Sequence, residues 1–320
     1  MNHSNTKLYK KFSIGISFYK MTADDWINIL NKYHFYINDI FFSPIESIDY
    51  QTRRNIYNYE KQDQFFLEGE LNKVLSAALD LGVARKIVLN VPKFLDNPDE
   101  LLIAYQRYKS RYDIEYVTTF LSCARKIKEI DNSQQIICSY NQGIKTEQEL
   151  EKILESNLFF SIVLGTNFYR NINAFRLIHQ YEQKIELLLN NGCMSNCASF
   201  CRLPNKYCKN NFAENLLHKG INCLYAECSM FPEEIHKYFL PNDLIDYYKL
   251  STRPIYFRGM IDMLSSYIEG ESSKYINTSV TNYNLYGRLA HYSGFYKELK
   301  YEEILKNKEA IWEQIKNKII

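Results

Sequence analysis

The sequence lacks an excess of charge of either sign, and it lacks long apolar runs. Lys and Arg number 39 against 37 Asp and Glu, which leaves a net charge of +2. Charge therefore does not indicate nucleic acid or an anionic membrane as a partner. No run reaches the roughly 18 apolar residues of a membrane span, and residues 1–20 show no signal-peptide pattern. We expect a cytoplasmic protein without a membrane span.

The sequence also lacks low-complexity linkers and exact internal repeats, which favours one domain with an appendage. Short β-rich runs alternate with helical patterns, and Thr22/Asp25 and Thr146/Glu149 form capping-box patterns at two helix starts. Several runs are almost entirely apolar, as in strands that are covered on both faces. The eight predicted strands are 11–18, 39–45, 85–92, 115–120, 134–141, 159–165, 184–191 and 246–253.

Eight alternating strand–helix units predict an α/β fold, a TIM-type (β/α)8 barrel, whose usual length is about 250 residues. We expect the barrel at 1–272, with a cysteine-rich loop at 192–228. Residues 273–320 are then a C-terminal helical extension packed on the barrel.

A barrel of this type carries its chemistry at the carboxyl ends of its strands, here called the mouth. Three cations fall at or after predicted strand ends: Arg170, Lys249 and Arg253. They are candidate catalytic residues, since cationic donors would bind an acidic group of a small-molecule or peptide substrate. Glu186 could act as a base, but it lies early in its strand and a structural ion pair is expected.

Cysteine is concentrated in one place. The chain has eight cysteines, and six lie within residues 193–228, directly after the seventh predicted strand. In a reducing cytosol, such a group indicates metal or redox chemistry more than disulfides. An iron–sulfur cluster takes four thiolates from irregular loops.

Structural zinc is the alternative, because Cys193/Cys197 and Cys223/Cys228 have the spacing of zinc-binding pairs. The spacing of Cys193, Cys197 and Cys201 is within one residue of the radical-SAM signature C-x3-C-x2-C. That signature normally follows the first barrel strand, and here the cysteines follow the seventh.

Two segments match known sequence motifs. IELLLNNGCMSNC resembles an E-L-L-V-N-x-G-C-x-x-x-C motif, and CSMFPEEIHKYFLPNDLIDYYKLSTRP resembles a stretch that ends in K-(I/L)-x-x-R. Both motifs resemble those of the collagenase-like peptidase superfamily, peptidase family U-thirty-two. GMIDMLSSYIEGE is similar to the helix that follows. VTTFLSCARKIKE and IICSYNQGIKTEQELEKI are similar to the fourth and fifth strand–helix units. The resemblance covers most of residues 11–271.

The resemblance implies a TIM-type barrel. Some members of the family are peptidases, and others support oxygen-independent hydroxylation of ubiquinone precursors, tRNA or ribosomal RNA, several of them with a 4Fe–4S cluster. Carried over by residue, it implies the ligands Cys193, Cys197 and Cys228. The fourth is Cys208, with Cys201 as the alternative. The expected function is therefore an iron–sulfur hydroxylase or tailoring enzyme, or its partner subunit.

The chain departs from the family in ways that weaken a peptidase assignment. The second G-x-C motif of the longer, peptidase-type members is absent, and Ala198 and Ser199 stand where relatives often have proline and arginine. The motifs H-E-x-x-H and G-x-S-x-G are also absent. None of the six histidines falls at a predicted strand end. A peptidase, and a non-catalytic zinc-stabilised barrel that binds a partner, remain the alternatives.

Overall fold

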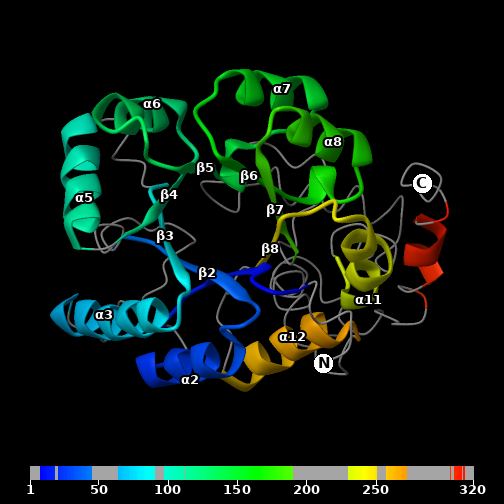
Figure 1. The fold of residues 1–320 in the computed structure, drawn as a ribbon, viewed down its shortest axis with the longest axis horizontal. Helices are drawn as coiled ribbons and strands as arrows, with labels where there is room; N and C mark the ends of the chain where they lie inside the picture. Colours follow the sequence, from blue (N-terminus) through cyan, green and yellow to red (C-terminus); the bar gives the residue numbers. More distant parts are fainter. Residues whose placement is uncertain are drawn as a thin grey trace, which may run out of the picture.

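In the computed structural model, the chain forms a closed barrel of eight parallel strands in sequential order (Figure 1). The structure describes residues 8–18, 21–44, 64–90, 97–111, 113–189, 230–250, 257–271, 303, 306–311 and 313. The strands are β1 (Phe12–Gly15), β2 (Ile37–Phe42), β3 (Ala84–Val88), β4 (Glu115–Thr118), β5 (Ile136–Cys138), β6 (Ser161–Leu164), β7 (Lys184–Leu188) and β8 (Tyr247–Leu250). The predicted (β/α)8 barrel is confirmed.

Helices surround the barrel on its outside (Figure 1). They are α2 (Ala23–Tyr33), α3 (Gln64–Asp80), α5 (Pro98–Arg111), α6 (Leu121–Ile130), α7 (Glu147–Glu155), α8 (Ile172–Gln180), α11 (Pro232–Glu234) and α12 (Phe257–Glu269). A π-helical turn, Ile235–Phe239, continues α11. None of the helices in the described ranges has the length and hydropathy needed to cross a membrane.

Local sequence signals explain where individual helices begin. Thr22 and Asp25 form a reciprocal capping box at the start of α2, and Thr146 and Glu149 form another at the start of α7. Both predicted capping boxes are confirmed. Each supplies acceptors for backbone N–H groups that have no partner within the helix.

The strands bury both of their faces, because one faces the helices and the other faces the barrel interior. In β6, for example, Ile162 and Leu164 belong to the main hydrophobic core, whereas Val163 belongs to a separate apolar cluster. Successive side chains on a strand point to opposite faces. This alternation explains why the strands read as nearly continuous apolar runs.

The predicted division at residue 272 falls outside the described residues. Residues 306–311 are helical, and within them the Lys308 ammonium donates to the Glu234 carboxylate of α11 at 2.9 Å. This ion pair links the C-terminal region to the helix that precedes β8.

Candidate functional site

The side chains that fill the barrel form three tiers, which we call lower, middle and upper, from the amino to the carboxyl ends of the strands. The lower tier is charged, the middle tier is apolar and the upper tier is small and polar. On β3, for example, Lys86, Val88 and Asn90 follow one another at every second position. The three tiers differ in what they can do chemically.

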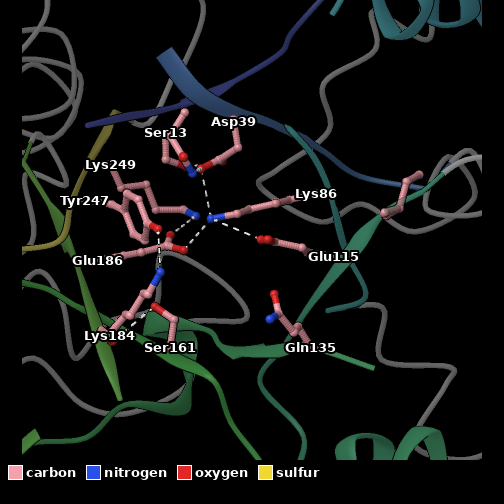
Figure 2. Close-up of polar contacts among 12 residues, drawn as sticks. Ser13, Asp39, Lys86, Glu115, Gln135, Ser161, Lys184, Glu186, Tyr247 and Lys249 are labelled. Carbon is pink, nitrogen blue, oxygen red and sulfur yellow. Dashed lines mark hydrogen bonds and ion pairs between the residues drawn. The ribbon is translucent and has the colours of Figure 1, made fainter. Parts of the chain in front are cut away.

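Lys86 is the centre of the lower tier (Figure 2). Its ammonium lies 2.9 Å from an Asp39 carboxylate oxygen, 2.5 Å from one of Glu186 and 3.6 Å from one of Glu115. The Lys249 ammonium lies 2.9 Å from the other Glu186 oxygen. The lower tier is therefore a closed ionic network that connects strands β2, β3, β4, β7 and β8.

Neutral groups and an aromatic ring also contact members of this network. The Ser13 hydroxyl donates to Asp39 at 2.5 Å, and the Asn38 amide donates to the second Asp39 oxygen at 2.9 Å. The Lys249 ammonium also lies over the Phe41 ring, 4.1 Å from its centroid. Since buried charges are tolerated only when they are paired and hydrogen-bonded, this arrangement meets the requirement for burial.

In this network, burial and neighbouring charges shift the pKa values of Lys86 and Glu186 in opposite directions. Burial alone would lower the pKa of Lys86, but Asp39, Glu186 and Glu115 together raise the pKa above its ordinary value. Burial alone would raise the pKa of Glu186, but Lys249 and Lys86 outweigh it and lower the pKa to about 2. Lys86 is thus held as a cation, which makes it a poor nucleophile or base.

Glu115 differs from the other carboxylates of the lower tier. Burial raises its pKa, and the attraction of Lys86 does not cancel this effect. The side chain is 26 % exposed, whereas that of Glu186 is fully buried. Glu115 is therefore the member of the network whose charge is least well compensated.

The middle tier separates these ions from the mouth. It is the apolar cluster of five residues against which Phe41 and Tyr140 also pack: Val88, Val117, Ile137, Val163 and Leu188. Each lies two residues after a lower-tier position or its equivalent on the same strand. The five side chains form an apolar layer between the ions and the mouth, which we call the floor. They offer no hydrogen bonds to a ligand at the mouth.

The upper tier consists of small polar side chains at the ends of β3, β4 and β5. The Asn90 side-chain oxygen accepts from the Thr119 backbone N–H at 2.7 Å, and the Asn90 amide donates to the Ser139 hydroxyl at 2.9 Å. Asn90 therefore joins three strand ends. The Thr119 hydroxyl is buried and has no hydrogen-bond partner within the described part of the chain.

Gly165 continues the upper tier after β6. A Cβ at this position would lie 2.1 Å from Cε2 of the Tyr140 ring, so the ring could not keep its place beside any other residue. A small pocket lies next to this contact, lined by Tyr140, Ile144, Val163, Leu164, Asn167 and Phe168, with the Gly165 backbone. The pocket shares Tyr140 and Val163 with the middle tier.

Arg170, predicted at the mouth, is bound to a buried carboxylate from another element. Its Nε donates to Glu234 at 2.6 Å, and Lys308 binds the other Glu234 oxygen. Burial alone would raise the pKa of Glu234, but Arg170 and then Lys308 lower it below its ordinary value. Burial lowers the pKa of Lys308 to about 7 despite the attraction of Glu234.

The structure does not bring the three predicted cations together. Lys249 points to Glu186 in the lower tier and Arg170 is paired with Glu234, while Arg253 lies outside the described residues. Their catalytic role stays a prediction. The structural ion pair expected for Glu186 is confirmed.

All the predicted cluster ligands, Cys193, Cys197, Cys201, Cys208 and Cys228, lie outside the described residues. The residues that border this segment are described. The Met230 backbone N–H donates to the Leu189 carbonyl at 3.3 Å, and the Leu189 N–H donates to the Lys249 carbonyl at 2.9 Å. The cysteine-containing segment therefore begins and ends beside the carboxyl end of β7.

The other two cysteines, Cys123 and Cys138, are buried as reduced thiols. Burial raises the pKa of Cys123 to about 11 and that of Cys138 to about 12, so both are held as thiols at neutral pH. Within the described ranges, no group of three or more His, Cys, Asp or Glu side chains is placed to hold a metal ion.

Sequence reasoning missed the lower tier and the Thr119 hydroxyl, which has no partner in the described part of the chain. A signal for the first was present, since Asp39 and Lys86 are charged residues inside otherwise apolar strands. At alternating positions, such residues must face either a helix or the barrel interior, and both are buried. Nothing in the sequence distinguishes Thr119 from the neighbouring Thr118.

Comparison with known proteins gives only distant structural similarities. No protein-family model and no curated protein matches the chain. An N-acetylneuraminate lyase from Mycoplasma synoviae is 13 % identical over 95 % of this chain and 98 % of its own, with a TM-score of 0.35. An endo-1,4-beta-xylanase from Caldicellulosiruptor owensensis is 10 % identical over 77 % of this chain and 86 % of its own, with a TM-score of 0.38. At these values neither structure informs the function, and the barrel assignment rests on the strand pairing.

Proposed function

We propose that this barrel holds a 4Fe–4S cluster at its mouth and acts in an oxygen-independent hydroxylation or related tailoring reaction, as the enzyme or as its partner subunit. The ligands are Cys193, Cys197, Cys228 and Cys208, with Cys201 as the alternative to Cys208. The substrate is a small molecule or a peptide. The observation that carries the proposal is the hydrogen bond between Leu189 and Met230, which holds the two ends of the cysteine segment at the mouth.

The covalent geometry of the chain limits where the first and last ligands can lie. Cys193 is four residues from Leu189 and so lies within about 14 Å of it. Cys228 is two residues from Met230 and so lies within about 7 Å of it. Since Leu189 and Met230 are in contact, the short chain lengths support ligand positions for both cysteines near the carboxyl end of β7. The active sites of such barrels are built at this end.

The donor set fits the proposed group. Four thiolates are the usual ligands of a 4Fe–4S cluster, and the segment supplies six cysteines. The buried Cys123 and Cys138 belong to the packed barrel and are not needed. When bound, a cluster of this kind supplies one-electron transfer to a substrate at the mouth.

The first experiment is purification without oxygen, followed by an absorbance spectrum and assays of iron, sulfide and zinc. We expect a brown protein with about four irons and four sulfides per chain. Cys193→Ala and Cys228→Ala should lose the iron, whereas the matched control Cys123→Ala should retain it. A colourless protein with one zinc per chain would overturn the cluster and leave a zinc-stabilised barrel.

Two further variants identify the fourth ligand. If Cys208 is the ligand, Cys208→Ala loses the absorbance of the cluster and Cys201→Ala retains it. The opposite result would transfer the role to Cys201. Both variants keep the three ligands implied by the family resemblance, so the comparison concerns the fourth position alone.

A further inference from the structure

Two neighbouring threonines at the end of β4 are both buried, but their hydroxyl groups differ in hydrogen bonding. Thr118 is 0 % exposed, and its hydroxyl accepts from the Phe120 backbone N–H at 3.1 Å. Thr119 is 4 % exposed, and its hydroxyl has no partner among the described residues. A buried hydroxyl without a partner is a net cost to folding. Thr119 therefore needs an explanation that Thr118 does not.

The groups around Thr119 are held in place by hydrogen bonds. The side-chain oxygen of Asn90 accepts a hydrogen bond from the Thr119 N–H, and its side-chain nitrogen donates one to the Ser139 hydroxyl. Ser139 is itself buried, at 3 % exposed. Because the oxygen and the nitrogen of its side-chain amide are both hydrogen-bonded, Asn90 cannot rotate freely. Asn90, Ser139 and the Thr119 backbone therefore form a rigid polar arc at the ends of β3, β4 and β5.

Below this arc lies an apolar floor, and the pocket adjoins the floor at Val163 and Tyr140. The floor includes Val117 and Ile137, each two residues before an upper-tier residue on its strand. The pocket that adjoins it is lined in part by Tyr140 and Val163. The arrangement combines a convergent polar group with apolar walls, which is the usual composition of a small-molecule site.

The charges of the surroundings indicate what kind of group can bind here. The upper tier carries no formal charge at its described positions. Among the described residues, the candidate cations Arg170 and Lys249 are directed to Glu234 and Glu186, so both already have carboxylate partners. An anionic group on this apolar floor would lose its hydration without gaining a counter-charge from either of them. A neutral hydroxyl, carbonyl or amide would lose less.

We propose that Asn90, Thr119 and Ser139 form a binding site for the uncharged hydroxyl, carbonyl or amide group of a small ligand whose apolar body lies on the floor of the middle tier. The Thr119 hydroxyl makes the direct hydrogen bond, and Asn90 and Ser139 position it. The site consists of the ends of β3, β4 and β5, so it goes beyond the proposed function and needs no metal at the cysteine segment.

The first test compares the two threonines by thermal unfolding of the full chain. Valine has nearly the shape of threonine, with a methyl group in place of the hydroxyl. Thr118→Val should lower the melting temperature, because it leaves the Phe120 N–H without its acceptor. Thr119→Val should match or exceed the wild type. A fall for Thr119→Val as large as that for Thr118→Val would show that the Thr119 hydroxyl has a structural partner, and would overturn the site.

The second test uses two probes of the same size, benzamide and benzoate, titrated into 15N-labelled full-length protein and followed by transverse-relaxation-optimised NMR. Benzamide should shift the amide signals of Thr119 and Gly165 more strongly than benzoate does. Thr119→Val should weaken benzamide binding by about fivefold, the value of one neutral hydrogen bond, and Thr118→Val should leave it unchanged.

Three results would overturn the proposal. Benzoate could bind as tightly as benzamide, which would contradict the preference for an uncharged group. The Thr119→Val variant could bind benzamide as the wild type does. The third result is that neither compound shifts these signals, which would leave a water molecule as the partner of the hydroxyl. None of these results depends on whether the cysteines bind iron, so the site and the cluster are tested separately.

Discussion

The lower and upper tiers of the barrel interior are both polar and both buried, yet they differ in how completely their groups are paired. In the lower tier, Lys86, Lys249 and Glu186 each contact an oppositely charged side chain at hydrogen-bond distance. In the upper tier, Asn90 makes two hydrogen bonds, but the Thr119 hydroxyl has no partner among the described residues.

Because of this difference, we assign a structural role to the lower tier and a ligand-binding role to the upper tier. A fully paired buried network rigidifies a fold and has no capacity left for a ligand. A group that remains unpaired lowers stability and is expected at functional sites. The lower tier also lies at the amino-terminal side of the floor, whereas ligands of such barrels bind at the carboxyl ends of the strands.

The largest expected effect comes from removing the centre of the lower tier. Lys86→Met leaves Asp39 and Glu186 buried without this cation, which should reduce the free energy of unfolding by about 3–5 kcal/mol. Urea denaturation followed by circular dichroism measures it. Lys73→Met is the control, because the ammonium of Lys73 is exposed beside Glu70 and its loss should change stability little. Equal losses in the two variants would contradict a structural role for the network.

A smaller loss of stability is expected from substitution of Asn90, which makes two hydrogen bonds in the upper tier. Asn90→Ala removes two hydrogen bonds and leaves the buried Thr119 N–H without its acceptor, which should cost about 2 kcal/mol. Asn242→Ala serves as a control, since its amide bonds an exposed carbonyl of Tyr238. If Asn90→Ala unfolds at the urea concentration of the wild type, the polar arc is not rigid and the comparison between the tiers fails.

The smallest effect concerns the pH dependence of the lower tier. The pKa of Glu115 is raised by burial, so the unfolded chain loses this proton at a lower pH than the folded chain does. Folding is therefore progressively disfavoured as pH rises above about 4.5 and through the raised pKa, and the penalty is constant beyond it. Glu115→Gln removes the penalty but also one neighbour of Lys86.

The measurement for this prediction is the difference in unfolding free energy between wild type and Glu115→Gln from pH 4 to pH 7. The stability of the wild type relative to the variant should fall across this range, by less than about 1 kcal/mol because the side chain is partly exposed. A relative gain in wild-type stability with rising pH would mean that the attraction of Lys86 dominates and that the pKa of Glu115 is lowered.

Much of the scaffold follows from local patterns in the sequence. The alternation of apolar strands with capped helices predicted all eight strands and both capping boxes. These features depend on residues close together in the chain, such as Thr22 and Asp25. The early position of Glu186 in its strand was also enough to predict a structural ion pair.

The partners of the charged residues could not be predicted in this way. Lys86 and Glu186 are 100 residues apart in the sequence, and Arg170 and Glu234 are 64 apart. Which strands face one another depends on closure of the barrel and on its register, and neither is encoded by a local pattern. The predicted cysteine ligands and Arg253 lie outside the described residues, so their roles stay predictions.

By itself, the sequence determined the number, order and approximate positions of the barrel strands, the start of two helices and the concentration of thiols after β7, because each depends on neighbouring residues. Only the tertiary structure decided that Lys249 and Arg170 bind buried carboxylates, that an apolar floor separates the ions from the mouth, and that the Thr119 hydroxyl, unlike that of Thr118, has no partner among the described residues. These features depend on which strand ends meet when the sheet closes, and the physical reason for each is the pairing of polar groups across distant segments.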